Sequence, residues 1–343
     1  MKIVTPIFLL IALISCNGQT KNSVKKEPSV IITDTLNLKK TIEENEGIVY
    51  FSYDNGVNWE NKSYGLPDKI SIGLGGIATS STSLGIASKE YGVFLYNFKT
   101  NSWENIPTDS KIIQSNLGAL FFYRANIYVG TQYGGVFTSP NQGETWTSNN
   151  QGLGNLTIRR FFEIDNILYV GTNDGIYSFN EAVNKWELEY GNSTLQVNGI
   201  TELDGNILIG TNQGAFMLDK ELKKWEQVFS NVVLHNISAF DNAVYAMTYN
   251  VLFSSTDKGV SWQSMQKGLP KELYTFNVIK NNKVTFAGQW DGVYRKDNLS
   301  GEWISSSNGL PKKFAVTNFK VYNGILVISC SERKLRTGMT TEK

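Results

Sequence analysis

A tryptophan recurs about every 40 residues along most of the chain, and this repeat limits the possible folds more than any other feature. Successive copies are 44, 43, 40, 39, 37 and 41 residues apart, at Trp59, Trp103, Trp146, Trp186, Trp225, Trp262 and Trp303. A period of this length with short alternating apolar stretches indicates repeated units that bury their faces against one another. No stretch keeps a helical periodicity, so we predict an all-β fold.

In three copies the tryptophan follows a tight turn, in residues 52–59 (SYDNGVNW), 139–146 (SPNQGETW) and 255–262 (STDKGVSW). We expect Asp54, Asn141 and Asp257 to accept hydrogen bonds from backbone N–H groups two residues later. The glycine of each turn can take a positive φ. Trp59, Trp146 and Trp262 should then bury their rings beneath the turns. Four looser copies place the Asp or Asn six residues before the tryptophan, at Asn97, Asn180, Asp219 and Asp297.

The three tight turns resemble the Asp-box (BNR) repeat of sialidases, sortilin ectodomains and photosystem assembly-factor propellers. The looser copies, of which residues 168–186 (LYVGTNDGIYSFNEAVNKW) are the clearest, resemble two-component-regulator and kelch-type propeller repeats. The resemblance covers about residues 46–333 and implies a β-propeller. It implies almost nothing about activity, because such turns hold blades together in unrelated proteins.

The number of blades follows from the two ends of the repeat region. Residues 47–63 read as only the third and fourth strands of a blade, and residues 314–330 as only the first and second. These halves should pair, because pairing leaves no open sheet edge. We therefore predict a seven-bladed propeller of four-stranded blades over residues 46–333, with the last blade closed by the two ends. Residues 334–343 would form a short C-terminal tail.

The first 15 residues predict a signal peptide. Lys2 precedes an apolar run over residues 3–14, which has the length of a signal-peptide core and is too short to span a bilayer. The run ends in LISC at Cys16, which resembles a bacterial lipoprotein signal and implies cleavage before Cys16 and lipidation of its thiol. The alternative is an ordinary secretory signal with an incidental cysteine. Stable membrane attachment would follow from several acyl chains.

The resemblance to lipoproteins also suggests the location. Asn17 differs from the Asp-type signal that retains lipoproteins in the inner membrane, so the outer membrane is expected, with its face undetermined. Residues 16–45 are polar and lysine-rich and read as a tether. The alternative for residues 30–38 is a short element that caps one blade.

Composition excludes several classes of partner. The chain has 32 Lys and Arg against 31 Asp and Glu, and loss of Lys2 would leave 31 of each, which argues against nucleic acid. No glycine-rich loop follows a strand and opens a helix, so no nucleotide is expected. A single histidine, His235, provides neither a zinc cluster nor a catalytic triad, and we predict no metal and no cofactor. With Cys16 lipidated, Cys330 would have no second cysteine for an intramolecular disulfide.

Two groups of residues are candidates for binding. The loops between the second and third strands should lie on one face, beside the channel mouth, and form a rim with exposed aromatic, amide and acidic side chains. Its main members are Tyr91, Tyr133, Asp174, Tyr249, Trp290 and Asp291. Aromatic faces and amides suit a sugar or a peptide. The alternative is that the aromatic rings pack against neighbouring blades.

The second group is a predicted collar of amides on the inner strands, with one cation. Its members are Asn116, Arg160, Asn198, Asn236, Asn277 and Asn318. If the collar binds a ligand, Arg160 would be its anion-binding member. The alternative is that each asparagine satisfies its own backbone.

Two functions are compatible with these patterns. The favoured one is a non-enzymatic, lipid-anchored envelope propeller that binds a glycan or a partner protein through the rim. The alternative is a carbohydrate-active enzyme, a glycoside hydrolase or sialidase-like, that uses Asp174, Asp291 or Glu90. A sialidase needs an arginine triad and an FRIP-like segment, whereas the chain has six arginines and, at best, YRAN at residues 123–126. Asp174 and Asp291 are three predicted blades apart, too far for paired-carboxylate hydrolysis.

Overall fold

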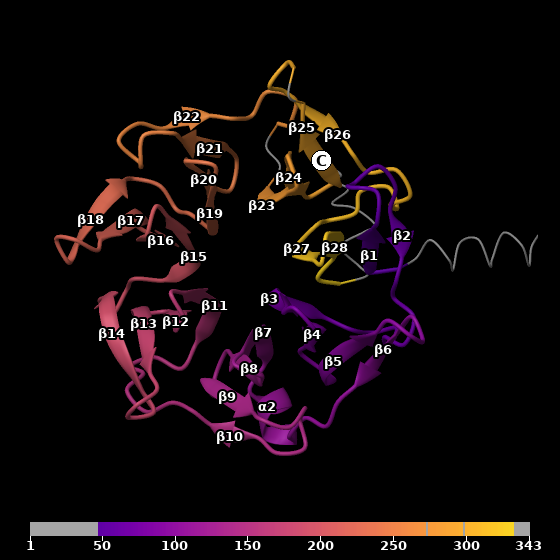
Figure 1. Cartoon of the computed structure of the whole chain (residues 1–343), viewed down its shortest axis with the longest axis vertical. Coiled ribbons are helices and arrows are strands. Elements are labelled where there is room, and N and C mark those ends of the chain that lie inside the picture. The colour runs from indigo at the N-terminus through magenta and orange to yellow at the C-terminus, as the bar shows by residue number, and fades with distance from the viewer. Residues whose placement is uncertain (1–46, 272–273, 298, 333–343) are drawn as a thin grey trace, which may run out of the picture. The chain divides into compact units, whose positions relative to one another are not determined.

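The computed structural model describes residues 47–271, 274–297 and 299–332, all within one of two units, residues 42–343. The predicted signal peptide, Cys16, the tether and the C-terminal tail lie outside the described residues. Within them, the strands form six sheets in which sequence neighbours pair antiparallel (Figure 1).

The sheets follow the chain order. Four contain consecutive strands: β11 (Ile158–Ile164), β12 (Ile167–Thr172), β13 (Gly175–Asn180) and β14 (Lys185–Gly191); β15 (Val197–Leu203), β16 (Asn206–Thr211), β17 (Gly214–Asp219) and β18 (Lys224–Phe229); β19 (Asn236–Phe240), β20 (Ala243–Met247), β21 (Leu252–Ser255) and β22 (Gln263–Ser264); and β23 (Thr275–Asn281), β24 (Val284–Gln289), β25 (Val293–Lys296) and β26 (Trp303–Ser305).

One sheet joins the two ends of the described chain. Its order is β2 (Glu60–Asn61), β1 (Val49–Ser52), β28 (Ile325–Ser329) and β27 (Asn318–Tyr322). β1 and β28 pair antiparallel from Val49 opposite Ser329 to Ser52 opposite Leu326. The predicted pairing of the first and last strands is therefore present.

The remaining sheet has eight strands: β10 (Thr147–Ser148), β9 (Val136–Ser139), β8 (Asn126–Thr131), β7 (Leu117–Tyr123), β3 (Ile72–Thr79), β4 (Leu84–Ser88), β5 (Gly92–Asn97) and β6 (Ser102–Asn105). A short helix, α2 (Ser110–Gln114), precedes β7. One parallel pairing, Gly75 with Ala119, links its two four-stranded halves. The close approach requires glycine, because a Cβ atom on Gly73 would lie 2.1 Å from the Gly118 carbonyl oxygen. The repeat pattern did not predict this link.

The sheets are arranged around a centre, with β3, β7, β11, β15, β19, β23 and β27 innermost (Figure 1). Apolar clusters fill the spaces between successive sheets. In one of them, Ile164 and Ile176 of one sheet pack with Ile200 and Ile209 of the next. Burial of such surfaces is the main stabilising contribution in a fold of this kind, and it leaves the inner strands to line the central channel.

The turns before the tryptophans use side-chain hydrogen bonds, but with a longer reach than expected. Asp257 Oδ1 accepts from the N–H of Ser261, four residues later rather than two, at 2.9 Å. Asp54 and Asn141 accept in the same way from Asn58 and Thr145. The serine that begins each turn accepts from the glycine N–H, as Ser255 does from Gly259 at 2.8 Å. The hydroxyl therefore binds the middle of the turn, and the carboxylate or amide binds its end.

The repeated tryptophans connect neighbouring repeats. Six of the seven donate their indole N–H to a backbone carbonyl of the preceding repeat, and each of these bonds measures between 2.7 and 2.9 Å. The acceptors are Ser306, Lys62, Pro107, Asn149, Val228 and Met265. Trp225 instead stacks on Tyr190, with ring centroids 5.3 Å apart. Trp59, Trp103, Trp186 and Trp303 are buried, whereas Trp146 and Trp262 are only half-buried.

Candidate functional site

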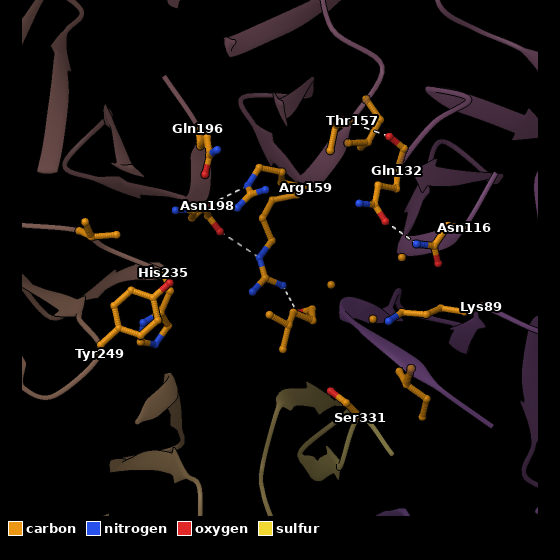
Figure 2. Close-up of a pocket in the computed structure, with 18 residues that line it drawn as sticks. Lys89, Asn116, Gln132, Thr157, Arg159, Gln196, Asn198, His235, Tyr249 and Ser331 are labelled. Carbon is orange, nitrogen blue, oxygen red and sulfur yellow. Dashed lines mark hydrogen bonds between the residues drawn. The ribbon is translucent and has the colours of Figure 1, made fainter. Parts of the chain in front are cut away.

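A cavity of about 380 Å³ lies among the inner strands β3, β7 and β11 and the loops that precede β15 and β19 (Figure 2). Arg159, Arg160 and Lys89 provide its positive charge, and Gln132, Gln196 and Asn198 provide amides. Ile72, Leu74 and Val233 form apolar lining, with Tyr249 and His235 at one side. Its volume lies in the range of small-molecule sites.

Arg159 and Arg160 reach the same cavity because β11 contains an irregularity. Its register with β12 shifts between Ile158, opposite Thr172, and Arg160, opposite Gly171. The extra residue, Arg159, breaks the strict alternation of a strand. Arg159 Nε donates to Asn198 Oδ1 at 2.6 Å, and its Nη1 donates to Asn173 Oδ1 at 2.9 Å.

Arg160 crosses the channel between two sheets. Its Nε donates to the carbonyl of Asn198 at 3.1 Å, and its Nη1 donates to the carbonyl of Leu74 on β3. All four acceptors of the two arginines are neutral. Among the described residues, neither arginine forms an ion pair, and no Asp or Glu lines the cavity.

This excess of positive charge, together with burial, shifts the pKa values of the cationic side chains. Burial, together with the charge of Arg159, lowers the pKa of Arg160 to about 10. Burial also lowers the pKa of Arg159. Lys320, on the inner strand β27, has its pKa lowered to about 8 by desolvation and then by the charge of Arg160. Lys320 is exposed to solvent, so its side chain extends from the inner strand into the channel and not into the apolar core.

The structure brings part of the predicted collar together. Asn236, Asn277, Asn318 and Arg160 share one register position, opposite Met247, Gly288, Ser329 and Gly171. Asn198 lies one residue earlier, at the register shift of β15. Asn116 lies outside β7, has a φ of 60° and donates to Gln132 Oε1. Bulges therefore displace Asn198 from the alignment that the sequence suggested, and Asn116 precedes its strand altogether.

The asparagines of the collar link adjacent sheets. Asn198 Nδ2 donates to the Leu234 carbonyl at 2.7 Å, Asn236 to Phe276 at 2.9 Å, Asn277 to Thr317 at 3.1 Å, and Asn318 to Gly73 at 3.0 Å. Each acceptor belongs to the inner strand of the next sheet or to the residues just before it. Each of these amides therefore donates to the backbone of a neighbouring sheet, and Asn236 Oδ1 also accepts from the N–H of Ile237 in its own strand. Arg160, the cation of the predicted collar, and its neighbour Arg159 keep unused N–H donors.

Two rim residues belong to one aromatic cluster. Tyr249 and Trp290 are joined through Tyr274, whose ring centroid is 5.2 Å from that of Tyr249 and 5.9 Å from that of Trp290. Phe276 stacks on Trp290 at 5.5 Å, and His235 lies 5.6 Å from Tyr249. Tyr249 is 49% exposed and lines the cavity. Tyr91 and Tyr133 are also exposed but belong to the eight-stranded sheet and do not line the cavity.

The two rim carboxylates are bound by tyrosines. Tyr177 donates to Asp174 Oδ2 at 3.0 Å, and Tyr294 donates to Asp291 Oδ2 at 2.9 Å. Burial and the adjacent Asp174 raise the pKa of Tyr177 to about 12. Neither Asp174 nor Asp291 lines the cavity. The shared spacing, DGIY and DGVY, is a sequence signal for this loop contact that the analysis of the rim missed.

His235 has a structural contact at the cavity wall. Its Nε2 donates to the Thr275 carbonyl at 2.7 Å, because a carbonyl can only accept. Burial lowers its pKa, and so does the charge of Arg160, while the bond to Thr275 opposes them. The ring is therefore neutral near pH 7. In the described ranges, no group of three His, Cys, Asp or Glu residues is arranged to hold a metal.

A second hollow of about 340 Å³ adjoins the first. It is lined mainly by the amides of Asn212, Gln213, Gln227 and Asn231, and Val233 borders both. Lys89, Asn212 and Gln213 lie in loops predicted for the rim, whereas no sequence pattern pointed to Gln227, Asn231, Arg159 or Lys320. The adjacent arginines Arg159 and Arg160 are the sequence signal that could have identified the cavity. Adjacent residues of a regular strand point to opposite faces, so one arginine would enter the apolar space between sheets unless the strand were irregular.

Comparison with known proteins gives the fold but no family. No protein-family model matches the chain, and no curated protein matches it. Similar solved structures include the extracellular domain of BT4673 from B. thetaiotaomicron, with a TM-score of 0.64 and 15% identity over 79% of this chain and 38% of that one. This chain therefore spans well under half of the BT4673 structure.

Two further structures match most of both chains. One is YCF48 bound to D1 peptide, with a TM-score of 0.62, 10% identity and coverage of 78% of this chain and 96% of that one. The other is BamB from Moraxella catarrhalis, with a TM-score of 0.53, 15% identity and coverage of 76% and 84%. These neighbours are β-propellers. The chain has a propeller fold. In the described part of this propeller, none of the helices could span a bilayer.

Proposed function

We propose that this protein is a non-enzymatic binding module of the bacterial cell envelope, which holds a partner at the channel mouth. The observation that carries the proposal is the composition of the cavity: three cations, several amides and an exposed tyrosine, with no carboxylate among its lining residues. General acid–base chemistry of the glycosidase type needs two carboxyl groups. Asp174 and Asp291 are each bound to a tyrosine away from the cavity, which weighs against the hydrolase alternative.

The partner is a glycan or an envelope protein, and we favour a protein. Apolar side chains such as Ile72, Leu74 and Val233 line the cavity beside the arginines, and this mixture suits a peptide better than a hydroxyl-rich sugar. The solved structure of YCF48 contains a bound D1 peptide, which supports the same choice by analogy. The amide-lined hollow beside the cavity is the feature that would favour a glycan.

The architecture we infer is a seven-bladed propeller. The eight-stranded sheet would count as two blades, since one parallel pairing joins its halves. The turns at Asp54, Asn141 and Asp257 would be Asp-boxes, supported by their common hydrogen bonds. Location rests on the sequence alone: a signal peptide over residues 1–15, lipid on Cys16, a tether over residues 16–45 and an outer-membrane site.

Affinity capture from detergent-solubilised envelopes tests the proposal. The tagged full-length chain should retain a partner that the Arg159→Gln variant loses. Arg295→Gln is the matched control, because Arg295 is an exposed arginine of β25 that does not line the cavity. A retained polypeptide would identify a protein partner, and a retained polysaccharide a glycan. If the unmodified protein, Arg159→Gln and Arg295→Gln all retained the partner equally, the cavity would not be part of the binding site.

A further inference from the structure

The two arginines of the cavity have donors to spare. A guanidinium group carries five N–H donors, and among the described residues Arg159 and Arg160 each donate two hydrogen bonds. In both side chains the bonds come from Nε and Nη1. Each guanidinium therefore keeps three N–H donors for a ligand, two on Nη2 and one on Nη1.

The cavity also lacks a counterion. Lys89 adds a third cation to its lining, and Lys320 lies within electrostatic reach of Arg160. Two acids adjoin lining residues in sequence, Glu90 beside Lys89 and Glu332 beside Ser331, but neither lines the cavity. Glu90 Oε2 accepts from the Ser71 N–H at 2.8 Å and the Ser88 hydroxyl at 3.1 Å. Like charges gathered at one cavity repel one another, so a bound anion would offset this repulsion.

From this arrangement we propose that the cavity is a carboxylate site, in which the ligand's carboxylate lies against Arg159 and Arg160 and its carbon body against the apolar lining. Guanidinium groups bind carboxylates through parallel hydrogen bonds, which fix orientation as well as charge. Leu74 and Val233 lie beside the arginines, which favours an organic acid over a strongly hydrated inorganic anion. Tyr249, half-exposed at the wall, offers a ring face for the same carbon body.

This inference rests on the proposed function, because it names the chemical group through which the partner would be held. It does not require that the partner be known. A small aromatic acid can serve as a probe, and its uncharged amide differs from it only in the group under test. The pair phenylacetate and phenylacetamide meets this requirement, with inorganic phosphate as the competing class of anion.

The experiment is a calorimetric titration at low ionic strength. Phenylacetate or phenylacetamide is added to the purified full-length protein in detergent. Phenylacetate should bind, phenylacetamide should bind at least about tenfold more weakly, and added salt should weaken the acid alone. Arg159→Gln should weaken phenylacetate binding about tenfold or more, and Arg295→Gln should leave it unchanged. Equal affinity for the acid and the amide, or an unchanged affinity in Arg159→Gln, would overturn the proposal. Tighter binding of phosphate than of phenylacetate would overturn the choice of carboxylate.

Arg160 also bonds to Asn198 and Leu74, so its replacement could disturb the fold. A second measurement on the unmodified protein avoids this difficulty. A bound carboxylate should raise the pKa of Lys320 and slow its acylation by an amine reagent at pH 8, whereas phenylacetamide should not. An unchanged rate under saturating phenylacetate would count against the site.

The two proposals can fail separately. If phenylacetate does not bind but envelope capture still depends on Arg159, the carboxylate inference fails and the proposed function stands. If phenylacetate binds as expected but no envelope partner is retained, the anion site stands and the proposed function fails.

Discussion

The indole N–H of Trp59 donates a 2.7 Å hydrogen bond to the carbonyl of Ser306, a residue 247 positions later in the chain. The same contact joins five other pairs of neighbouring repeats over 34 to 41 residues, and only the junction at Trp225 lacks it among the described repeats. Here it joins the sheet that contains β1 and β28 to the sheet before it. A second bond, from the Trp59 backbone N–H to the Asn308 carbonyl at 2.9 Å, reinforces the same seam. Ring closure therefore uses the same tryptophan-to-carbonyl hydrogen bond as five of the internal junctions.

Trp59→Phe should lower the free energy of unfolding by about 1–3 kcal/mol, because the buried Ser306 carbonyl loses its donor. Urea unfolding followed by tryptophan fluorescence measures this loss. Trp225→Phe is the matched control, since Trp225 stacks on Tyr190 and has no such indole hydrogen bond. Equal losses in the two variants would show that ring packing, and not the hydrogen bond, stabilises the seam.

Asp257 should make stability depend on pH in the acid range. Hydrogen bonds from Ser261, followed by one from Ser255, lower the pKa of Asp257 from 3.8 to about 2. The folded state therefore favours the carboxylate, so this contribution is present above pH 4 and is lost as the pH falls towards 2.

Asp257→Asn should flatten the decline in thermal midpoint between pH 4 and pH 2. The amide retains an acceptor oxygen for the Ser261 N–H, as Asn141 does for Thr145. Asp297→Asn is a comparison in a looser turn, where Ser300 lowers the pKa of Asp297 in the same direction. If the thermal midpoints of the wild type and of Asp257→Asn fell in parallel between pH 4 and pH 2, Asp257 would not be the source of the pH dependence.

The repeat predicted much of the fold because the tryptophans, the turns and the two incomplete ends each reflect local chemistry. β1 pairs with β28 because an unpaired apolar strand at each end would otherwise be exposed. The Gly75–Ala119 link could not be predicted in the same way. It depends on glycines of two repeats meeting in space, and a glycine in a strand gives no indication of which backbone approaches it.

The candidate site was less predictable from the sequence. The collar was aligned by counting residues, and the shift between Val197 and Gly199 displaces Asn198 from that count. The same kind of shift brings Arg159 beside Arg160. Asp174, a predicted rim residue, accepts a hydrogen bond from Tyr177 and does not line the cavity. In each case a tertiary contact determines the role, and the residue type alone does not.

Lys320 should titrate near neutrality rather than near its ordinary pKa. Desolvation, followed by the charge of Arg160, lowers its pKa to about 8. The charged residue on the adjacent inner strand β23, Lys280, is paired with Asp241. Because the folded state disfavours the charged amine, stability should rise as the pH increases from about 8 towards 10.5.

Lys320→Met should remove this rise, as measured by the thermal midpoint across the pH range. Lys280→Met is the control, because Lys280 lies on the neighbouring inner strand and is paired with Asp241. Competitive acylation gives an independent value for the pKa of Lys320. An acylation midpoint near 10.5 would contradict the prediction.

Asn277 tests whether the amide collar is structural. Its Nδ2 donates to the carbonyls of Thr317 at 3.1 Å and Val316 at 3.3 Å, which precede the inner strand of the next sheet. The side chain is only 9% exposed, so Asn277→Ala leaves two buried acceptors without this donor and should cost about 1–3 kcal/mol. Asn116→Gly is the matched control, because the Asn116 side chain bonds only to the exposed side chain of Gln132 and glycine tolerates the φ of 60° at this position; it should change stability by less than about 0.5 kcal/mol. If Asn277→Ala were neutral in urea unfolding and instead abolished partner capture, the collar would be a binding element and not a link between sheets.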